Sequence, residues 1–123
     1  MAAATKFNSF VEDVFEKVHN LGSDTLKVML TNSAPLVTNT VKADLTEISS
    51  GNGYTAGGTA ASISSSAQSS GTYKLVLADV TWTASGGSIG PFRYATLYND
   101  TAASDQLIMF WDYGSSVTLA AGE

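Results

Sequence analysis

The chain has 123 residues, enough for one domain with one core, and its 6 basic and 11 acidic residues give a net charge of −5. The acidic balance and the scattered basic residues argue against a nucleic-acid partner. The lack of cysteine excludes a disulfide framework and a zinc-finger site.

The first residues predict neither a signal peptide nor a membrane span. Met1–Lys6 lead into alternating acidic and apolar residues, and no apolar run is long enough for either kind of segment. Serine, threonine and glycine are abundant, which is typical of all-β proteins with many turns. We therefore expect a single domain over residues 1–123 that makes no contact with a membrane.

Residues 9–20 are predicted to form one amphipathic helix packed against a sheet. Ser9 and Glu12 have the spacing of a capping box at its start, and Gly22 can end it. His19 would then lie in the last turn, where the helix dipole favours it. The apolar stripe consists of Phe7, Phe10, Val11, Val14, Phe15, Val18 and Leu21.

The next fifty residues predict one clear strand followed by irregular structure. Residues 25–31 alternate with a period of two, as a half-buried strand does. The pattern of residues 41–48 is ambiguous, and we expect a single helical turn or a loop. Residues 51–72 are rich in glycine and serine, so a strand near Thr59–Ser66 should lie at an edge or bend.

Residues 73–112 read as consecutive strands joined by short turns. Residues 73–83 predict one long strand, or two with a bulge at Ala78-Asp79. Leu107–Trp111 is apolar on both faces, as a central strand is, and a short segment at residues 117–119 follows. The strand after Gly90-Pro91 is expected to carry Phe92, Tyr94, Thr96 and Tyr98 on one face and Arg93, Ala95, Leu97 and Asn99 on the other.

Together these patterns predict a mainly β fold. We expect an antiparallel β-sandwich of about six to seven strands over about residues 24–120, with one N-terminal amphipathic α-helix.

Two glycine-rich motifs resemble functional signatures, but their context contradicts both. Residues 86–90 match a nucleophile elbow around Ser88, yet a proline and a strand pattern follow instead of a helix, and the only histidine, His19, lies upstream. Residues 51–56 loosely fit a dinucleotide fingerprint without the flanking strand and helix. We predict structural turns at both motifs, no catalytic residue, no enzymatic activity and no cofactor.

No metal site is predicted. His19 has no second histidine and no cysteine with which to share a metal ion. Asp44 and Glu47 are three residues apart and could bind a hard cation, but a solvated acidic turn is the better interpretation.

The aromatic residues of the strands could line a groove for a glycan or a peptide. About half of them are needed for the core, so one aromatic set is expected to stay partly exposed. Exposed aromatic rows beside hydroxyl groups are typical of protein–protein contact surfaces. The residues predicted to bind a partner are Tyr54, Arg93, Tyr98, Trp111 and Tyr113.

Four ordered blocks carry a family resemblance: Ser23–Asn32, Gly51–Gly58, Ala78–Ala84 and Arg93–Asp100. Together they resemble a family of small virion structural proteins of tailed bacteriophages, over most of the chain. The resemblance implies a capsid decoration (cement) protein or a small tail-associated protein without enzymatic activity. Members of that family continue beyond the position of Gly122-Glu123 into a further apolar strand, so either this chain is shorter than they are or a neighbouring subunit supplies the strand. An open sheet edge near Val117–Leu119 would favour pairing with another chain.

The leading hypothesis is a decoration protein that binds between major capsid subunits and stabilises the shell. We expect a homo-oligomer, assembled in the host cytoplasm and located in the virion, whose partners are the major capsid protein or tail components. The first alternative is a tail- or neck-associated protein, such as a connector or a fibre-associated module. The second, from another class, is a carbohydrate-binding module that uses Trp82, Trp111 or Tyr98 as stacking platforms.

Overall fold

A computed structural model describes residues 3–123 and confirms a mainly β, antiparallel fold with one short helix near the N-terminus. One sheet has five strands in the order β1-β7-β6-β2-β3, and a second sheet is the hairpin β4–β5. The strands are β1 (Ala4–Lys6), β2 (Leu26–Thr31), β3 (Thr59–Ala60), β4 (Ile63–Ser69), β5 (Thr72–Leu77), β6 (Ile89–Asn99) and β7 (Leu107–Leu119).

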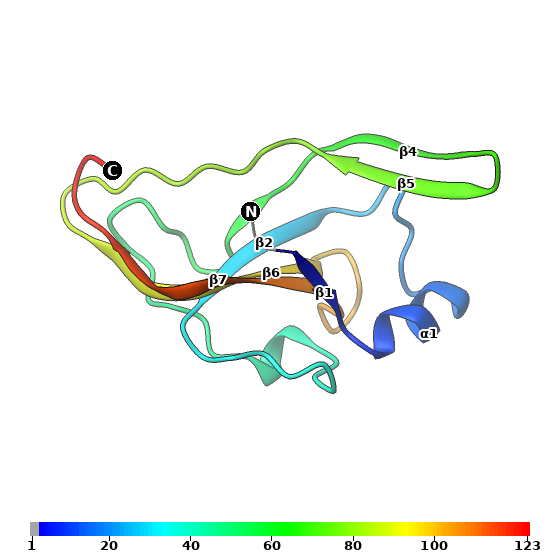
Figure 1. Cartoon of the computed structure of the whole chain (residues 1–123), viewed down its shortest axis with the longest axis horizontal. Coiled ribbons are helices and arrows are strands. Elements are labelled where there is room, and N and C mark those ends of the chain that lie inside the picture. The colour runs from blue at the N-terminus through cyan, green and yellow to red at the C-terminus, as the bar shows by residue number, and fades with distance from the viewer. Residues whose placement is uncertain (1–2) are drawn as a thin grey trace.

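The five-stranded sheet lies between two unequal covers (Figure 1). The hairpin and the extended segment 78–84 cover one face, where Leu75 and Leu77 of β5 pack on buried residues of the sheet. The loop that contains the 3-10 turn Lys42–Asp44 covers the other face, where Leu45 packs. Both covers are small, so the molecule is a sandwich with one complete sheet and one partial layer.

The strand patterns place apolar side chains on both faces of the sheet. Leu26, Leu97 and Ile108 are buried under the hairpin. On the opposite face the buried side chains are Phe7, Met29, Tyr98 and Leu107. β2, β6 and β7 therefore provide the apolar contacts to the covers on both faces of the sheet.

The helix is shorter than predicted. α1 spans Ser9–Phe15 instead of residues 9–20, and the predicted capping box is absent because Asn8 is the N-cap and makes no side-chain hydrogen bond. The chain leaves the helix at Lys17, whose φ is 68°. Consequently His19 does not lie in a helical turn, and Gly22 does not end the helix. No helix within residues 3–123 has the length and apolar character needed to cross a membrane.

The prediction of a strand at residues 80–83 is wrong, although the alternation was correct. Val80 and Trp82 are half-buried and Thr81 and Thr83 are exposed, but the segment belongs to no sheet. The β4–β5 ladder ends at the pair Ile63–Leu77, and the last bond beyond it is from the Ala78 N–H to the carbonyl of Ser62. The chain then crosses the sheet, and a strand pattern without a neighbour cannot form a ladder.

β6 and β7 form one long ladder with interruptions. Tyr94 pairs with Asp112 and Phe92 with Val117, so residues 113–116 of β7 bulge opposite Arg93 alone. The bulge turns Phe92 onto the face of Leu30 and Ala95, which corrects the predicted face for Phe92. Residues 117–119 belong to β7 and do not form a separate segment.

The edges of the large sheet are short or incompletely covered. β3, which was expected at an edge, is the edge strand beside β2. β1, which the sequence did not predict, pairs only with Met109–Trp111. Within residues 3–123 the outer edge of Val117–Leu119 therefore has no ladder partner, but it is only three residues long and follows the bulge.

Candidate functional site

Two of the predicted partner-binding residues are core residues. Tyr54 is 2% exposed and Tyr98 is 1% exposed. The Tyr98 hydroxyl donates to the carbonyl oxygen of Gly57 at 2.5 Å, so the ring is tied to the loop that covers it. A partner cannot reach either ring in this fold. We therefore assign Tyr54 and Tyr98 to the core and not to a contact surface.

Glu47 is the centre of a polar cluster around Tyr54. Its Oε2 accepts hydrogen bonds from the Tyr54 hydroxyl at 2.5 Å and from the Gly57 N–H at 2.6 Å, and its Oε1 lies 3.3 Å from Lys42 Nζ. The Tyr54 hydroxyl also accepts the Leu30 N–H at 3.0 Å. Burial, together with the bond to Glu47, raises the pKa of Tyr54 far above its usual range.

Asp44 and Glu47 do not converge on a cation site. The Asp44 Oδ2 accepts the N–H groups of Thr40 at 2.9 Å and Val41 at 3.3 Å, and these bonds lower the pKa of Asp44. The Glu47 carboxylate is used by the polar cluster described above. Across residues 3–123 no group of three or more histidine, cysteine, aspartate or glutamate side chains could hold a metal ion.

The other three predicted partner-binding residues lie together. Arg93, Trp111 and Tyr113 line a cavity of about 240 Å³, here called the small hollow. Its remaining lining residues are Leu30, Trp82, Phe92, Tyr94 and Ala95. Tyr113 is 70% exposed at its rim. The β6–β7 bulge makes this arrangement possible because it places Tyr113 outside the regular ladder.

Arg93 is held in place by its neighbour on β7. Its Nε and Nη2 donate to the Asp112 carboxylate at 2.8 and 3.1 Å, and its guanidinium lies 5.3 Å from the centre of the Tyr94 ring. The Arg93 guanidinium lowers the pKa of the Asp112 carboxyl. The small hollow thus combines aromatic walls with an oriented ion pair.

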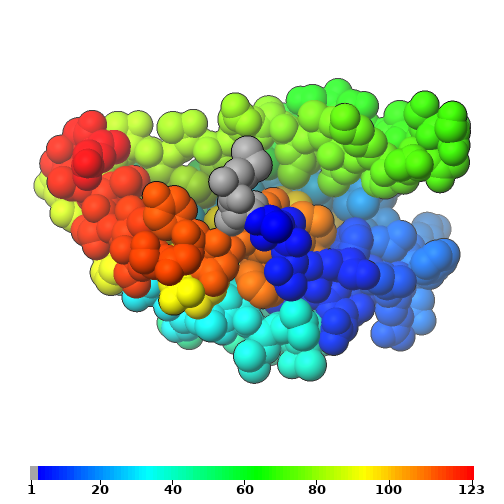
Figure 2. Space-filling view, in the orientation of Figure 1, coloured from blue at the N-terminus to red at the C-terminus, as the bar shows by residue number. Residues whose placement is uncertain are grey.

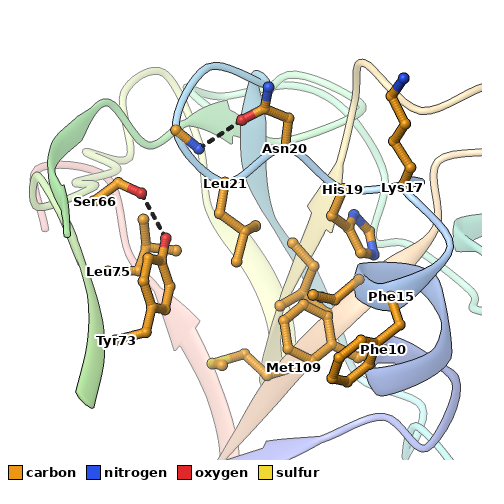
Figure 3. A pocket seen from close by; sticks show the side chains of 13 residues that line it. Phe10, Phe15, Lys17, His19, Asn20, Leu21, Ser66, Tyr73, Leu75 and Met109 are labelled. Carbon is orange, nitrogen blue, oxygen red and sulfur yellow. Dashed lines mark hydrogen bonds between the residues drawn. The ribbon is translucent and has the colours of Figure 1, made fainter. Parts of the chain in front are cut away.

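A larger cavity lies at the other end of the same sheet face. This large hollow, of about 890 Å³, opens between α1, β7 and the hairpin. Figure 3 shows Phe10 and Phe15 of α1 on one side of it and Tyr73 and Leu75 of β5 on the other. Its lining residues are Phe10, Val14, Phe15, Lys17, His19, Asn20, Leu21, Gly22, Ser66, Tyr73, Leu75, Ile108 and Met109.

Large aromatic side chains at the large hollow are unusually exposed to solvent. Phe15 is 86% exposed and Tyr73 is 49% exposed, and the Tyr73 hydroxyl is fixed by Ser66 Oγ at 2.6 Å. Sequence reasoning missed this site because the helical stripe was expected to be buried against a sheet. One signal was present: the stripe has more apolar residues than a short helix can bury.

His19 is buried beside the large hollow. Its Nδ1 lies 3.0 Å from the Asn99 Nδ2, so Nδ1 accepts a hydrogen bond and the proton is on Nε2, which lies 3.9 Å from Asp13. The same Asn99 amide donates to Asp24 at 2.7 Å. Burial lowers the pKa of His19, which favours the neutral ring.

The two glycine-rich motifs are structural turns, as predicted. Ile89, the residue after Ser88, begins β6, so a strand and not a helix follows the serine. The Ser88 carbonyl accepts a hydrogen bond from Asn52 Nδ2 at 2.9 Å, which joins the two motifs. Gly53 has a positive φ and packs on the backbone of Thr83, where a Cβ would collide.

Comparison of the chain with protein-family models gives no match, and comparisons with curated proteins and with solved structures give none either. A functional proposal must therefore rest on the two hollows and on the sequence resemblance described above.

Proposed function

We propose that this protein is a structural component of a tailed-phage virion, most directly a capsid decoration (cement) protein that binds the major capsid protein and stabilises the shell. The observation that carries the proposal is the pair of apolar hollows on one sheet face, with Phe15, Tyr73 and Tyr113 exposed at their rims. Exposed aromatic clusters of this kind mark protein contact surfaces. The resemblance of four sequence blocks to virion proteins supplies the identity of the partner.

The mechanism requires binding and no covalent chemistry. Aromatic side chains fixed on a β-scaffold lose little conformational entropy when a partner covers them, which makes them effective anchors. A capsid repeats the same contact many times by symmetry. Modest contacts by each copy, strengthened where copies also touch one another, therefore suffice to stiffen the shell.

Co-sedimentation with expanded, undecorated capsids tests the proposal. We expect saturable, stoichiometric binding by the wild-type protein. The double variant Phe15→Ser/Tyr113→Ser should bind more weakly, because both rims lose an anchor. The matched control is Leu36→Ser, since Leu36 is 61% exposed but lines neither hollow. Absence of binding by the wild-type protein would count against a capsid role.

The small hollow favours one second candidate, a carbohydrate-binding module. Trp111 and Tyr113 could stack on a sugar ring while the Arg93–Asp112 pair hydrogen-bonds its hydroxyl groups. Tyr98, an expected stacking platform, is buried and is excluded from this role. The candidate therefore depends on the aromatic lining of the small hollow, which includes Trp82, Trp111 and Tyr113.

A further inference from the structure

Asn52 and Gly53 form the tip of a tight two-residue turn. Gly51 and Tyr54 pair across it as an antiparallel bridge, and the φ angles of Asn52 and Gly53 are 59° and 107°. Two positive φ angles are typical of the type I′ hairpin turn, which favours asparagine followed by glycine. Both residues are exposed. The fold therefore presents the one Asn-Gly pair of the sequence to solvent.

The fold requires glycine at the second position of this turn. A Cβ on Gly53 would lie 2.2 Å from the backbone oxygen of Thr83, and the positive φ of Gly53 would strain any other residue. The Gly53 N–H makes no hydrogen bond within residues 3–123. The nitrogen that follows Asn52 is therefore neither shielded by a side chain nor engaged by a carbonyl.

Such a pair can deamidate without an enzyme, because asparagine is a chemically labile residue. The Gly53 nitrogen loses its proton to solvent base and attacks the Asn52 Cγ, a succinimide ring closes, and the side-chain nitrogen leaves as ammonia. Water then opens the ring at either carbonyl carbon and gives aspartate or isoaspartate. The net reaction consumes one water and releases one ammonia, and neither an oxidant nor a metal is needed.

The Asn52 side chain is held at the surface by one hydrogen bond within residues 3–123. Its Nδ2 donates to the Ser88 carbonyl at 2.9 Å, and it lies so close to Gly87 that an added Cβ there would be 2.7 Å from Nδ2. The Asn52 carbonyl accepts the Ser85 N–H at 2.9 Å. An exposed side-chain bond opens more readily than a buried one, which lets the Asn52 Cγ turn toward the Gly53 nitrogen.

The same contacts hold one end of the extended segment 78–84. That segment belongs to no sheet, so single hydrogen bonds position its end. On one side the C-terminal residues bond Ala84 at 2.6 and 2.8 Å, and Figure 2 shows them, in red, beside the light-green end of the segment. On the other side, a carboxylate at position 52 could not donate to the Ser88 carbonyl. Isoaspartate would also lengthen the turn by one backbone methylene.

We propose that Asn52 is a site of spontaneous deamidation in the folded protein, and that its conversion to aspartate or isoaspartate releases the turn at residues 85–88 from the turn at residues 51–54. The modification adds one negative charge at a corner of the molecule where segments far apart in the sequence meet. It goes beyond the proposed function and does not depend on it, because the reaction needs no partner.

Incubation of the intact protein at mildly alkaline pH tests the chemistry. Trypsin then releases peptide 43–74, in which Asn52 is the only asparagine, and peptide 28–42, whose Asn32 and Asn39 serve as internal references. By mass spectrometry, the acid form of peptide 43–74 should accumulate several-fold faster than that of peptide 28–42, as two isomers, and faster still at higher pH. Asn52→Gly should remove it. Equal rates in the two peptides, or no conversion of Asn52, would overturn the proposal.

The release of the turn has its own measurement. In aged protein and in the variant Asn52→Asp, the Ser85 amide hydrogen should exchange several-fold faster than in fresh wild-type protein. The matched control is Asn39→Asp, which adds the same charge but keeps an oxygen that can accept the Leu36 N–H, as Asn39 does at 2.7 Å. This control should leave Ser85 exchange unchanged. Deamidation at Asn52 with unchanged Ser85 exchange would refute the release of the turn.

Discussion

The Tyr54 hydroxyl donates a 2.5 Å hydrogen bond to the Glu47 carboxylate and accepts the backbone N–H of Leu30 in β2 at 3.0 Å. One side chain thereby connects the covering loop to the central sheet. This contact adds to the bond from the Ile48 N–H to the Leu30 carbonyl at 3.1 Å, which also joins the loop to β2. The same contact explains why Tyr54 is in the core and cannot serve as a contact residue.

Removal of that hydroxyl should destabilise the fold. Tyr54→Phe keeps the ring but leaves the Leu30 N–H without its partner and the Glu47 carboxylate with one donor fewer. We expect a loss of about 1–3 kcal/mol in the free energy of unfolding, measured in urea. Tyr113→Phe is the control, because the exposed Tyr113 hydroxyl should contribute nothing measurable. A loss in Tyr54→Phe no larger than in this control would show that the cluster does not hold the loop.

Alkaline pH should destabilise the fold through the two buried tyrosines, Tyr54 and Tyr98. Burial raises the pKa values of Tyr54 and Tyr98 above the ordinary 10.0, so above that pH the unfolded chain has lost protons that the folded chain retains. Stability is then fully present below pH 10.0 and falls as the pH rises further. Unfolding free energies measured between neutral and alkaline pH should show this slope, and Tyr54→Phe should reduce it. An unchanged slope in the variant would contradict the assignment.

Acidic pH should destabilise the fold through protonation of His19. Its pKa is lowered by burial, so below the ordinary value of 6.5 the unfolded chain binds a proton that the folded chain resists. Its contribution to stability is therefore present above pH 6.5 and is lost as the pH falls. Asp13 and Asp24 face the ring and moderate the effect. His19→Gln should reduce the change in stability between neutral pH and pH 6 or below, which thermal unfolding measures. The same pH dependence in the variant and in the wild-type protein would refute this prediction.

Substitution of Trp82 tests how the segment 78–84, which crosses the sheet without pairing with it, is anchored. Its ring is half-buried and lies 6.0 Å from the Tyr54 ring. Trp82→Ala should cost about 3 kcal/mol, the lower end of the range for large aromatic residues, because part of the ring is already exposed. Thr81→Ala is the matched control on the exposed side of the segment. A change below that of the control would mean that the segment is not anchored by Trp82.

Tryptophan fluorescence separates the two functional candidates for the small hollow. If Trp111 and Tyr113 bind sugars, titration with glycans of the host surface should change the tryptophan emission, and Tyr113→Ser should abolish the change. The decoration proposal predicts no saturable change across the glycan panel. Saturable quenching that depends on Tyr113 would favour the carbohydrate-binding candidate.

The sequence predicted those elements whose patterns are local. The alternation of residues 25–31 located β2, and the glycine-rich, apolar-poor stretch after it located the edge strand β3. Helix length was not predictable, because the turn at Lys17 interrupts an apolar stripe that continues at helical spacing. The pattern around Trp82 was correct, yet only the presence of a neighbouring strand decides whether such a pattern becomes a sheet.

The candidate site was predictable in part. Arg93, Trp111 and Tyr113 were identified from their residue types, and the structure places them around one hollow. Tyr54 and Tyr98 have the same residue types, but a covering loop buries them, and no local pattern encodes how a loop docks. The large hollow was missed for the related reason that it forms between segments far apart in the sequence.

The central claim, that this protein is a component of a tailed-phage virion, is tested most directly by quantitative mass spectrometry of purified virions. A decoration protein should be present in hundreds of copies per particle, in a fixed ratio to the major capsid protein. A tail or neck protein would instead be present in small multiples of three or six copies. Complete absence of the protein from purified virions would contradict a structural role in the particle.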